Sequence, residues 1–131
     1  MPTESLASVT VMARYIRIEN LTRGSVVAER CRIAGTLVQR IFGLHLLPRL
    51  AVGEGLLLPG ATTIDTTFMS YAIDLVFLDR ARVVTRTVGN LVPWRMVIRS
   101  GGGLDCLELP AGAAAASRTE ARDQLSFVDL P

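Results

Sequence analysis

Short apolar segments separated by turn-forming residues run through most of the chain. β-branched and aromatic residues are frequent from Val9 to Glu19, which predicts a strand. Residues 20–25, with Gly24, supply a turn after which Val26 to Ile33 pairs back, so a β-hairpin is predicted. Regular short segments punctuated by glycine and proline predict a mainly β sandwich or barrel of jelly-roll type, not a parallel α/β sheet. The further predicted strands are 55–58, 62–68, 73–78, 82–88, 104–109 and 125–128.

The segment from Ile73 to Leu78 is apolar at both alternating positions, with Asp74 as the exception. That pattern predicts a strand covered on both faces. A helix is predicted over 36–44, because Thr36 and Gln39 form a capping box and apolar residues follow with helical spacing. We expect this short helix to pack on the sheet.

Two further features are predicted near the C-terminus. The alanine run from Ala111 to Ala116 favours a short helical turn, and the polar residues 117–124 after it are typical of a surface loop. The triple glycine at 101–103 lacks the Lys-Ser/Thr sequel of a phosphate-binding loop, so it predicts a turn.

Composition indicates one folded domain over residues 1–131, with 1–8 as a disordered tail. Half of the 131 residues are apolar and the mean hydropathy is +0.39, which excludes an intrinsically disordered protein. No uncharged stretch approaches the roughly 18 residues that span a bilayer, so we expect a soluble protein without a membrane span. The N-terminal residues lack the apolar segment of a secretory signal, and we therefore expect a cytoplasmic location.

The basic residues are all arginine: 14 arginines and no lysine, with a net charge of +2. Lysine Schiff-base chemistry is excluded. The arginines are scattered, which argues against a nucleic-acid partner, and we expect most of them to border turns and strand edges. Arg40 and Arg95 are the two to which we assign a functional role.

Metal and thiol chemistry have little support. The chain has one histidine and two cysteines, Cys31 and Cys106, which are far apart in the sequence. A zinc site is therefore not indicated, and we predict neither a metal nor a cofactor. In a reducing compartment the cysteines are expected to be free, buried thiols.

Three carboxylates, Asp65, Asp74 and Glu108, interrupt apolar strand sequence. A buried carboxylate must be paired, hydrogen-bonded or shifted in pKa. In one interpretation these groups accept backbone N–H bonds or pair with arginine to fix strand ends. In the other they act as acid and base in a hydrolase.

A second set of residues lies near the predicted strand ends and could line a ligand cleft. An aromatic residue beside an arginine, as in Trp94-Arg95, suits a ligand or partner surface. The ligand-binding candidates are Asp65, Thr67, Met69, Trp94, Arg95 and Arg40.

Five short motifs follow one another along the chain. They are Arg40-Ile41-Phe42-Gly43-Leu44, Gly55-Leu56-Leu57-Leu58, Thr66-Thr67-Phe68-Met69, Ile73-Asp74-Leu75-Val76-Phe77-Leu78-Asp79 and Leu107-Glu108-Leu109-Pro110-Ala111-Gly112. In this order they resemble the bacterial and archaeal family called domain of unknown function 192, over residues 26–128. The resemblance implies a compact, mainly β fold with a packed short helix, but no reaction, cofactor or partner.

The chain departs from that family pattern at two places. Asp65 stands where relatives often carry histidine, and Leu46 and Leu47 stand where they carry an arginine after the helix motif. If relatives use these polar side chains in a functional site, that site is altered or lost in this chain.

Taken together, the sequence predicts a non-enzymatic accessory module that binds a small polar ligand or a protein partner. A hydrolase using Asp65, Asp74 or Glu108 is one alternative. A purely structural domain that dimerises through an edge strand is the other.

Overall fold

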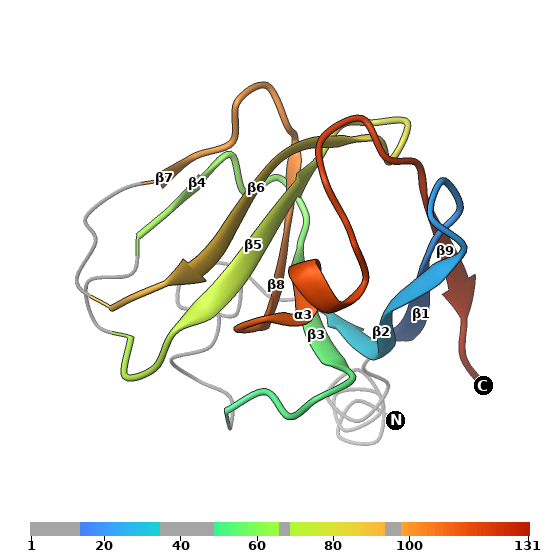
Figure 1. Cartoon of the computed structure of the whole chain (residues 1–131), viewed down its shortest axis with the longest axis horizontal. Helices are drawn as coiled ribbons and strands as arrows, with labels where there is room; N and C mark the ends of the chain where they lie inside the picture. The colour runs from blue at the N-terminus through green and yellow to red at the C-terminus, as the bar shows by residue number, and fades with distance from the viewer. Residues whose placement is uncertain (1–13, 35–48, 66–68, 94–97) are drawn as a thin grey trace, which may run out of the picture.

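A computed structural model describes residues 14–34, 49–65, 69–93 and 98–131. Seven strands form one sheet in the order β6-β5-β8-β3-β2-β1-β9, beside a two-stranded sheet of β4 and β7 and the short helix α3 (Figure 1). The large sheet contains β1 (Tyr15–Asn20), β2 (Ser25–Ile33), β3 (Glu54–Leu58), β5 (Ile73–Leu78), β6 (Val84–Leu91), β8 (Asp105–Pro110) and β9 (Leu125–Asp129). The remaining elements are β4 (Thr63–Ile64), β7 (Ile98–Arg99) and α3 (Ala113–Ala116).

The mainly β fold predicted from the sequence is confirmed, with differences in detail. β1 and β2 form the expected hairpin, and the alanine run forms α3. The predicted helix over 36–44 and the start of the first predicted strand lie outside the described residues. Two features had no sequence signal: the two-residue strand β7, and the parallel pairing of β2 with β3.

The large sheet curls into a half-barrel. Its two edge strands, β6 and β9, meet at their beginnings through a bridge between Val83 and Gln124. Backbone hydrogen bonds continue this contact, from the Val84 N–H to the Asp123 carbonyl at 2.8 Å and from the Arg122 N–H to the Val84 carbonyl at 2.7 Å. The C-terminal strand therefore pairs with β1 along its length and touches β6 at one end.

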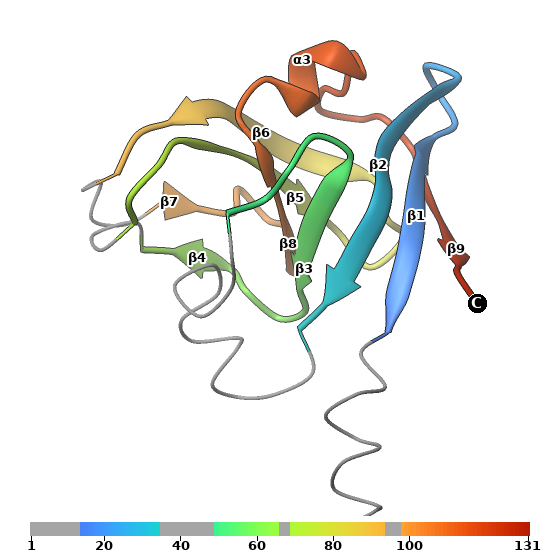
Figure 2. The ribbon, with the colours of Figure 1, turned by 90° about the horizontal axis from the view of Figure 1, so that it is seen from below.

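The curled sheet has two buried faces, each with its own apolar core. The helix face packs beneath α3 and includes Ile16, Ile18, Val76, Leu107 and Leu109. The small-sheet face packs against Ile64 of β4 and Ile98 of β7 and includes Leu56, Leu75, Phe77 and Cys106. Figure 2 shows α3 on one side of the sheet and the β4–β7 pair on the other.

The central strand β5 is buried along its whole length, as its sequence predicts. Leu75 and Phe77 face the small-sheet core, whereas Val76 and Leu78 face the helix core. Since side chains alternate between the faces of a strand, the apolar run at both parities is explained by two covered faces.

The polar segment 117–124 is a loop, as predicted, but only part of it faces solvent. Arg118, Glu120 and Arg122 are exposed, whereas the side chains of Ser117, Thr119 and Asp123 are buried. Asn20, at the end of β1, donates to Thr119 and Asp123 on the helix face, and the Ser117 hydroxyl bonds Thr119 and the carbonyls of α3. Within the described ranges, no helix is long and apolar enough to cross a membrane.

Candidate functional site

A pocket of about 250 Å³ lies at the small-sheet face of β1, β2 and β3. Three arginines dominate its lining, and we call it the arginine pocket. The lining residues are Tyr15, Arg30, Arg32, Arg49, Leu50, Glu54 and Gly55.

Strand register brings the pocket residues together. Arg30 and Arg32 are two positions apart on β2, so they project from the same face, opposite to Cys31 in the helix-face core. Arg32 lies opposite Tyr15 of β1, and Arg30 lies opposite Glu54 of β3. The segment just before β3 adds Arg49 and Leu50.

Two of the three guanidinium groups stack on aromatic rings. The Arg30 guanidinium lies 3.8 Å from the centroid of the Tyr15 ring, and that of Arg49 lies 4.9 Å from the centroid of Tyr71. Stacking restrains the side chain while the N–H groups, which lie in the guanidinium plane, stay available for a planar oxyanion. Both arginines are thus held by their π faces rather than by their hydrogen-bonding edges.

The pocket arginines have no ion-pair partner within the described part of the chain. Arg14, Arg17 and Arg23 pair with carboxylates, but Arg30, Arg32 and Arg49 do not. The one lining carboxylate, Glu54, accepts a hydrogen bond from the Ala51 N–H at 2.7 Å. Three cations facing one carboxylate leave the lining with an excess positive charge.

Two buried polar groups without partners lie beside the pocket. Glu108 is on β8 and is 4% exposed, and its Oε2 has no hydrogen-bonding partner among the described residues. The Tyr71 hydroxyl is buried and unpartnered in the same way. Burial raises the pKa of Tyr71 most, and the Glu108 carboxyl adds to the rise, whereas the backbone of Leu50 and the charge of Arg49 oppose it. The Leu50 backbone thus lies near the hydroxyl, but not in the geometry of a full hydrogen bond.

Glu108 belongs to the same row of side chains as the pocket. Arg32, Leu56 and Glu108 are register partners across β2, β3 and β8, so Arg32 and Glu108 project from the same face of the sheet. With strands about 4.8 Å apart, their backbones lie about 10 Å from each other. Burial raises the pKa of Glu108 to about 8, so this carboxyl is largely protonated at neutral pH.

Asp74 is buried on the opposite face and is fully engaged. Its Oδ1 accepts the Asn90 N–H at 2.7 Å, and its Oδ2 accepts the N–H groups of Gly112 at 3.1 Å and Ala114 at 2.9 Å. These bonds tie β5 to the end of β6 and to the beginning of α3. Such a geometry corresponds to the structural interpretation, in which the carboxylate fixes strand ends.

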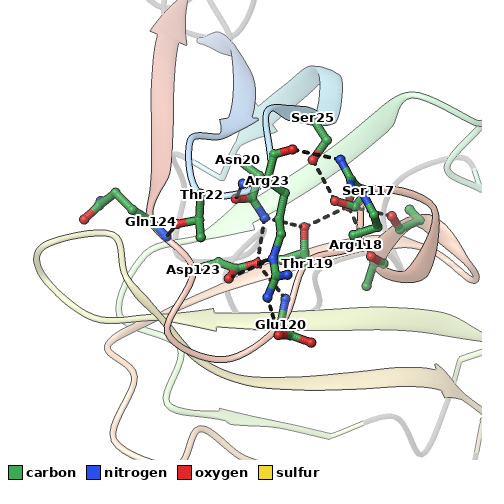
Figure 3. A network of polar contacts seen from close by, with 12 residues as sticks. Asn20, Thr22, Arg23, Ser25, Ser117, Arg118, Thr119, Glu120, Asp123 and Gln124 are labelled. Atoms are coloured by element: carbon green, nitrogen blue, oxygen red, sulfur yellow. Dashed lines mark hydrogen bonds and ion pairs between the residues drawn. The ribbon is translucent and has the colours of Figure 1, made fainter.

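The helix face also holds a polar network around Asn20 (Figure 3). The Asn20 side-chain amide donates to Thr119 Oγ1 at 3.1 Å and to Asp123 Oδ2 at 2.9 Å. Arg23 adds an ion pair with Asp123 at 3.1 Å and one with Glu120. Burial alone would raise the pKa of Asp123, but the hydrogen bonds from Asn20 and Arg23 outweigh it and lower that pKa.

The three carboxylates predicted from the sequence do not all converge. Asp74 pairs in register with Leu109 of the helix-face core, whereas Glu108 pairs with Leu75 of the small-sheet core. The two acids therefore lie on opposite faces of the sheet and cannot share a substrate. Asp65 is exposed and directly follows β4.

The predicted cleft is mostly outside the described residues: Arg40, Thr67, Trp94 and Arg95 all lie there. Met69 is described and belongs to the small-sheet core, with 7% exposure. Sequence reasoning missed Arg30, Arg32 and Arg49, which it assigned to strand borders. The alternation of Arg30 and Arg32 around the apolar Cys31 was the available signal, but Arg49 depends on the tertiary fold.

Cys31 and Cys106 are free and buried, as predicted. They lie on opposite faces of the sheet, and β3 separates their strands. Burial raises the pKa of Cys31 to about 12 and that of Cys106 well above its usual range. Across the described ranges, no group of three histidine, cysteine or acidic side chains could hold a metal ion.

Comparisons with known proteins agree with this architecture. The model of the DUF192 family, described as an uncharacterised ACR, matches residues 18–127. A "UPF0127 protein" of Thermococcus sibiricus is 31% identical over 112 residues, covering 82% of this chain and 72% of that protein.

Two solved structures share the fold. One, from Sinorhizobium meliloti 1021 and described as a "putative transcription regulator", has a TM-score of 0.75 and 20% identity, covering 87% of this chain and 92% of its own. The other, a protein of unknown function from Novosphingobium aromaticivorans, has a TM-score of 0.70 and 22% identity, covering 86% and 83%. At these identities the likeness concerns the fold alone.

Proposed function

This chain belongs to the DUF192 family, and we propose that it is a non-enzymatic binding module whose arginine pocket holds a small anionic ligand. The family supplies no reaction, so the proposal rests on the pocket itself. The sequence predicted a small polar ligand. The present proposal makes that ligand an anion and places its site at other residues than the sequence suggested.

One observation carries the proposal: three arginines line one pocket without an ion pair to any described residue. Like charges gathered at close range repel each other, and guanidinium groups bind carboxylate and phosphate with paired N–H donors. An anion in the pocket would relieve the repulsion and use N–H donors that no described residue engages.

The stacking arrangement supports the same conclusion. Tyr15 and Tyr71 restrain Arg30 and Arg49 through their rings, which lowers the conformational entropy lost when a ligand orders those side chains. Structural arginines in this protein, such as Arg23, are instead held by carboxylates.

A binding role also agrees better with the positions of the acids than a hydrolase does. Asp74 and Glu108 are on opposite sheet faces, and all the hydrogen bonds of Asp74 go to backbone N–H groups. A two-carboxylate mechanism with this pair is therefore not supported. The regulator description belongs to the Sinorhizobium protein, whose likeness to this chain is one of fold.

The direct test is isothermal titration calorimetry of the full chain with inorganic phosphate, sulfate and acetate at fixed ionic strength. We expect saturable binding of at least one of these anions. Replacing Arg32 and Arg49 together by glutamine should weaken that binding by at least tenfold, because each charge-assisted hydrogen bond contributes about 1.5 to 3 kcal/mol.

A matched control separates the pocket from general charge. Arg86→Gln and Arg99→Gln together also remove two positive charges, at β6 and β7, where Arg86 donates to the Arg99 carbonyl at 2.7 Å. These changes should leave anion affinity within about twofold of the wild type. Equal weakening in both double variants, or no saturable binding by the wild-type protein, would overturn the proposal.

A further inference from the structure

We infer that the ligand of the arginine pocket is an oxyanion that also carries a hydroxyl group, and that Tyr71 and Glu108 bind this hydroxyl. The inference rests on the proposed function and adds the chemical class of the ligand. Hydroxy acids and polyol phosphates share this chemistry.

Unpartnered buried polar atoms are concentrated beside the arginine pocket. Four buried side-chain polar atoms have no hydrogen-bonding partner among the described residues. Three of them, Arg32 Nε, the Tyr71 hydroxyl and Glu108 Oε2, belong to this region, and the fourth is Arg17 Nε on β1. A buried unpaired polar group is costly, and native structures contain few of them, so several in one region need an explanation. A bound polar ligand would satisfy them.

The Tyr71 and Glu108 side chains lie just behind the pocket lining. Arg32 lines the pocket, and Glu108 lies in the same row of the sheet, one strand beyond Leu56. The Tyr71 ring lies under the guanidinium of Arg49, another lining residue. The Glu108 carboxyl is close enough to Tyr71 to raise its pKa, so the contacts lead from Arg49 through Tyr71 to Glu108.

The side chains of Tyr71 and Glu108 decide which ligand group fits beside them. A second anionic group would face the Glu108 carboxyl in a buried setting, where like charges are costly. A hydroxyl both donates and accepts, which suits the Tyr71 hydroxyl and a carboxyl in either protonation state. Because burial raises the pKa of Glu108 to about 8, this carboxyl can itself donate below that pH.

The test compares ligands that differ by the polyol part. Calorimetry at pH 6.5 would measure the affinities of inorganic phosphate, glycerol 3-phosphate, acetate and glycerate for the full chain. We expect at least one hydroxylated anion to bind about fivefold or more tightly than its simple counterpart, phosphate or acetate. Comparing the phosphate ligands with the carboxylate ligands shows which oxyanion the arginines prefer.

Tyr71→Phe is the most informative variant, because it removes the hydroxyl but keeps the ring beneath Arg49. It should abolish the preference for the hydroxylated anion, measured as the ratio of its affinity to that of phosphate or acetate for the same variant. Glu108→Gln is a second, nearly isosteric variant that should reduce the same preference. Arg49→Gln should weaken both kinds of anion.

The outcomes separate the two proposals. Simple anions that bind without any preference for the hydroxylated ones, or a Tyr71→Phe variant that weakens both equally, would overturn the present inference and leave the anion pocket intact. If no anion binds to the wild-type protein, the proposed function fails and this inference fails with it.

Discussion

The two faces of the curled sheet bury polar groups in opposite ways. On the helix face, Asp74 accepts three backbone N–H groups, and Asn20, Arg23 and Asp123 satisfy one another. On the small-sheet face, Glu108 and Tyr71 keep unpartnered atoms and the pocket arginines have no carboxylate partner within the described residues.

The contrast indicates which polar residues serve the fold. Asp74 and Glu108 are both buried acids on neighbouring strands, and nothing in their local sequence distinguishes a structural acid from an unsatisfied one. Their partners make the difference. A satisfied buried group stabilises the folded state, whereas an unsatisfied one lowers its stability and is retained where a ligand can complete it.

The largest effect that we predict is a pH dependence of stability arising from Glu108. Its pKa is about 8 in the folded protein against an ordinary 4.5, so between these values the folded state holds a proton that the unfolded chain has released. Raising the pH through this window therefore favours unfolding, by about 1.4 kcal/mol per pH unit at most. Urea denaturation at pH 5, 6, 7 and 8 would measure it.

Glu108→Gln provides the comparison for that experiment. The variant cannot ionise, so its free energy of unfolding should vary much less over the same range. The Asp123 network responds in a different window, because its lowered pKa makes its contribution disappear only in acid, below the ordinary value of 3.8. Parallel profiles for wild type and Glu108→Gln from pH 5 to 8 would contradict the assignment.

The next effect contrasts the two buried acids directly. Asp74→Ala should lower the free energy of unfolding by about 3 kcal/mol, because it removes the acceptor of three backbone N–H groups. Glu108→Leu should leave the free energy of unfolding unchanged or raise it at pH 5, where the acid is protonated. The substitution replaces an unsatisfied polar group by an apolar side chain of similar volume.

The control for this pair is Asp79→Ala. Asp79 also accepts backbone bonds, from Ala81 at 2.9 Å and Val83 at 3.0 Å, but the Ala81 bond is exposed to solvent. Its loss should cost about 1 kcal/mol. Chemical denaturation that finds Asp74→Ala as mild as this control, or Glu108→Leu as damaging as Asp74→Ala, would remove the distinction between the faces.

The smallest effect compares a network residue with a pocket residue. Asn20→Ala should cost about 2 kcal/mol, since Thr119, Asp123 and the Arg23 N–H each lose a buried partner. Arg30→Gln should lower stability by less than about 1 kcal/mol, because it loses the stacking on Tyr15 but no ion pair to a described residue. Thermal unfolding without added phosphate or sulfate would measure the stability of both variants. If both lose a similar amount of stability, the pocket arginines serve the fold.

Much of the architecture was readable from local pattern. The hairpin, the doubly covered strand β5 and the short helix in the alanine run follow from residue alternation, turn residues and helix propensity. Each depends on neighbours within a few positions, so one stretch of sequence carries the signal. The free cysteines were expected on a different ground, a reducing compartment, and the structure places them on opposite faces of the sheet.

The sequence by itself marked three acids that interrupt apolar strands, and two of them, Asp74 and Glu108, are buried, whereas Asp65 is exposed. Only the tertiary structure decided that the two buried acids face opposite sides, that segment 117–124 turns inward to Asn20, and that Arg30, Arg32 and Arg49 share one pocket. These outcomes depend on strand order and register, above all on the parallel pairing of β2 with β3. Register is set by packing between residues distant in sequence, and a shift of one residue moves every side chain to the other face.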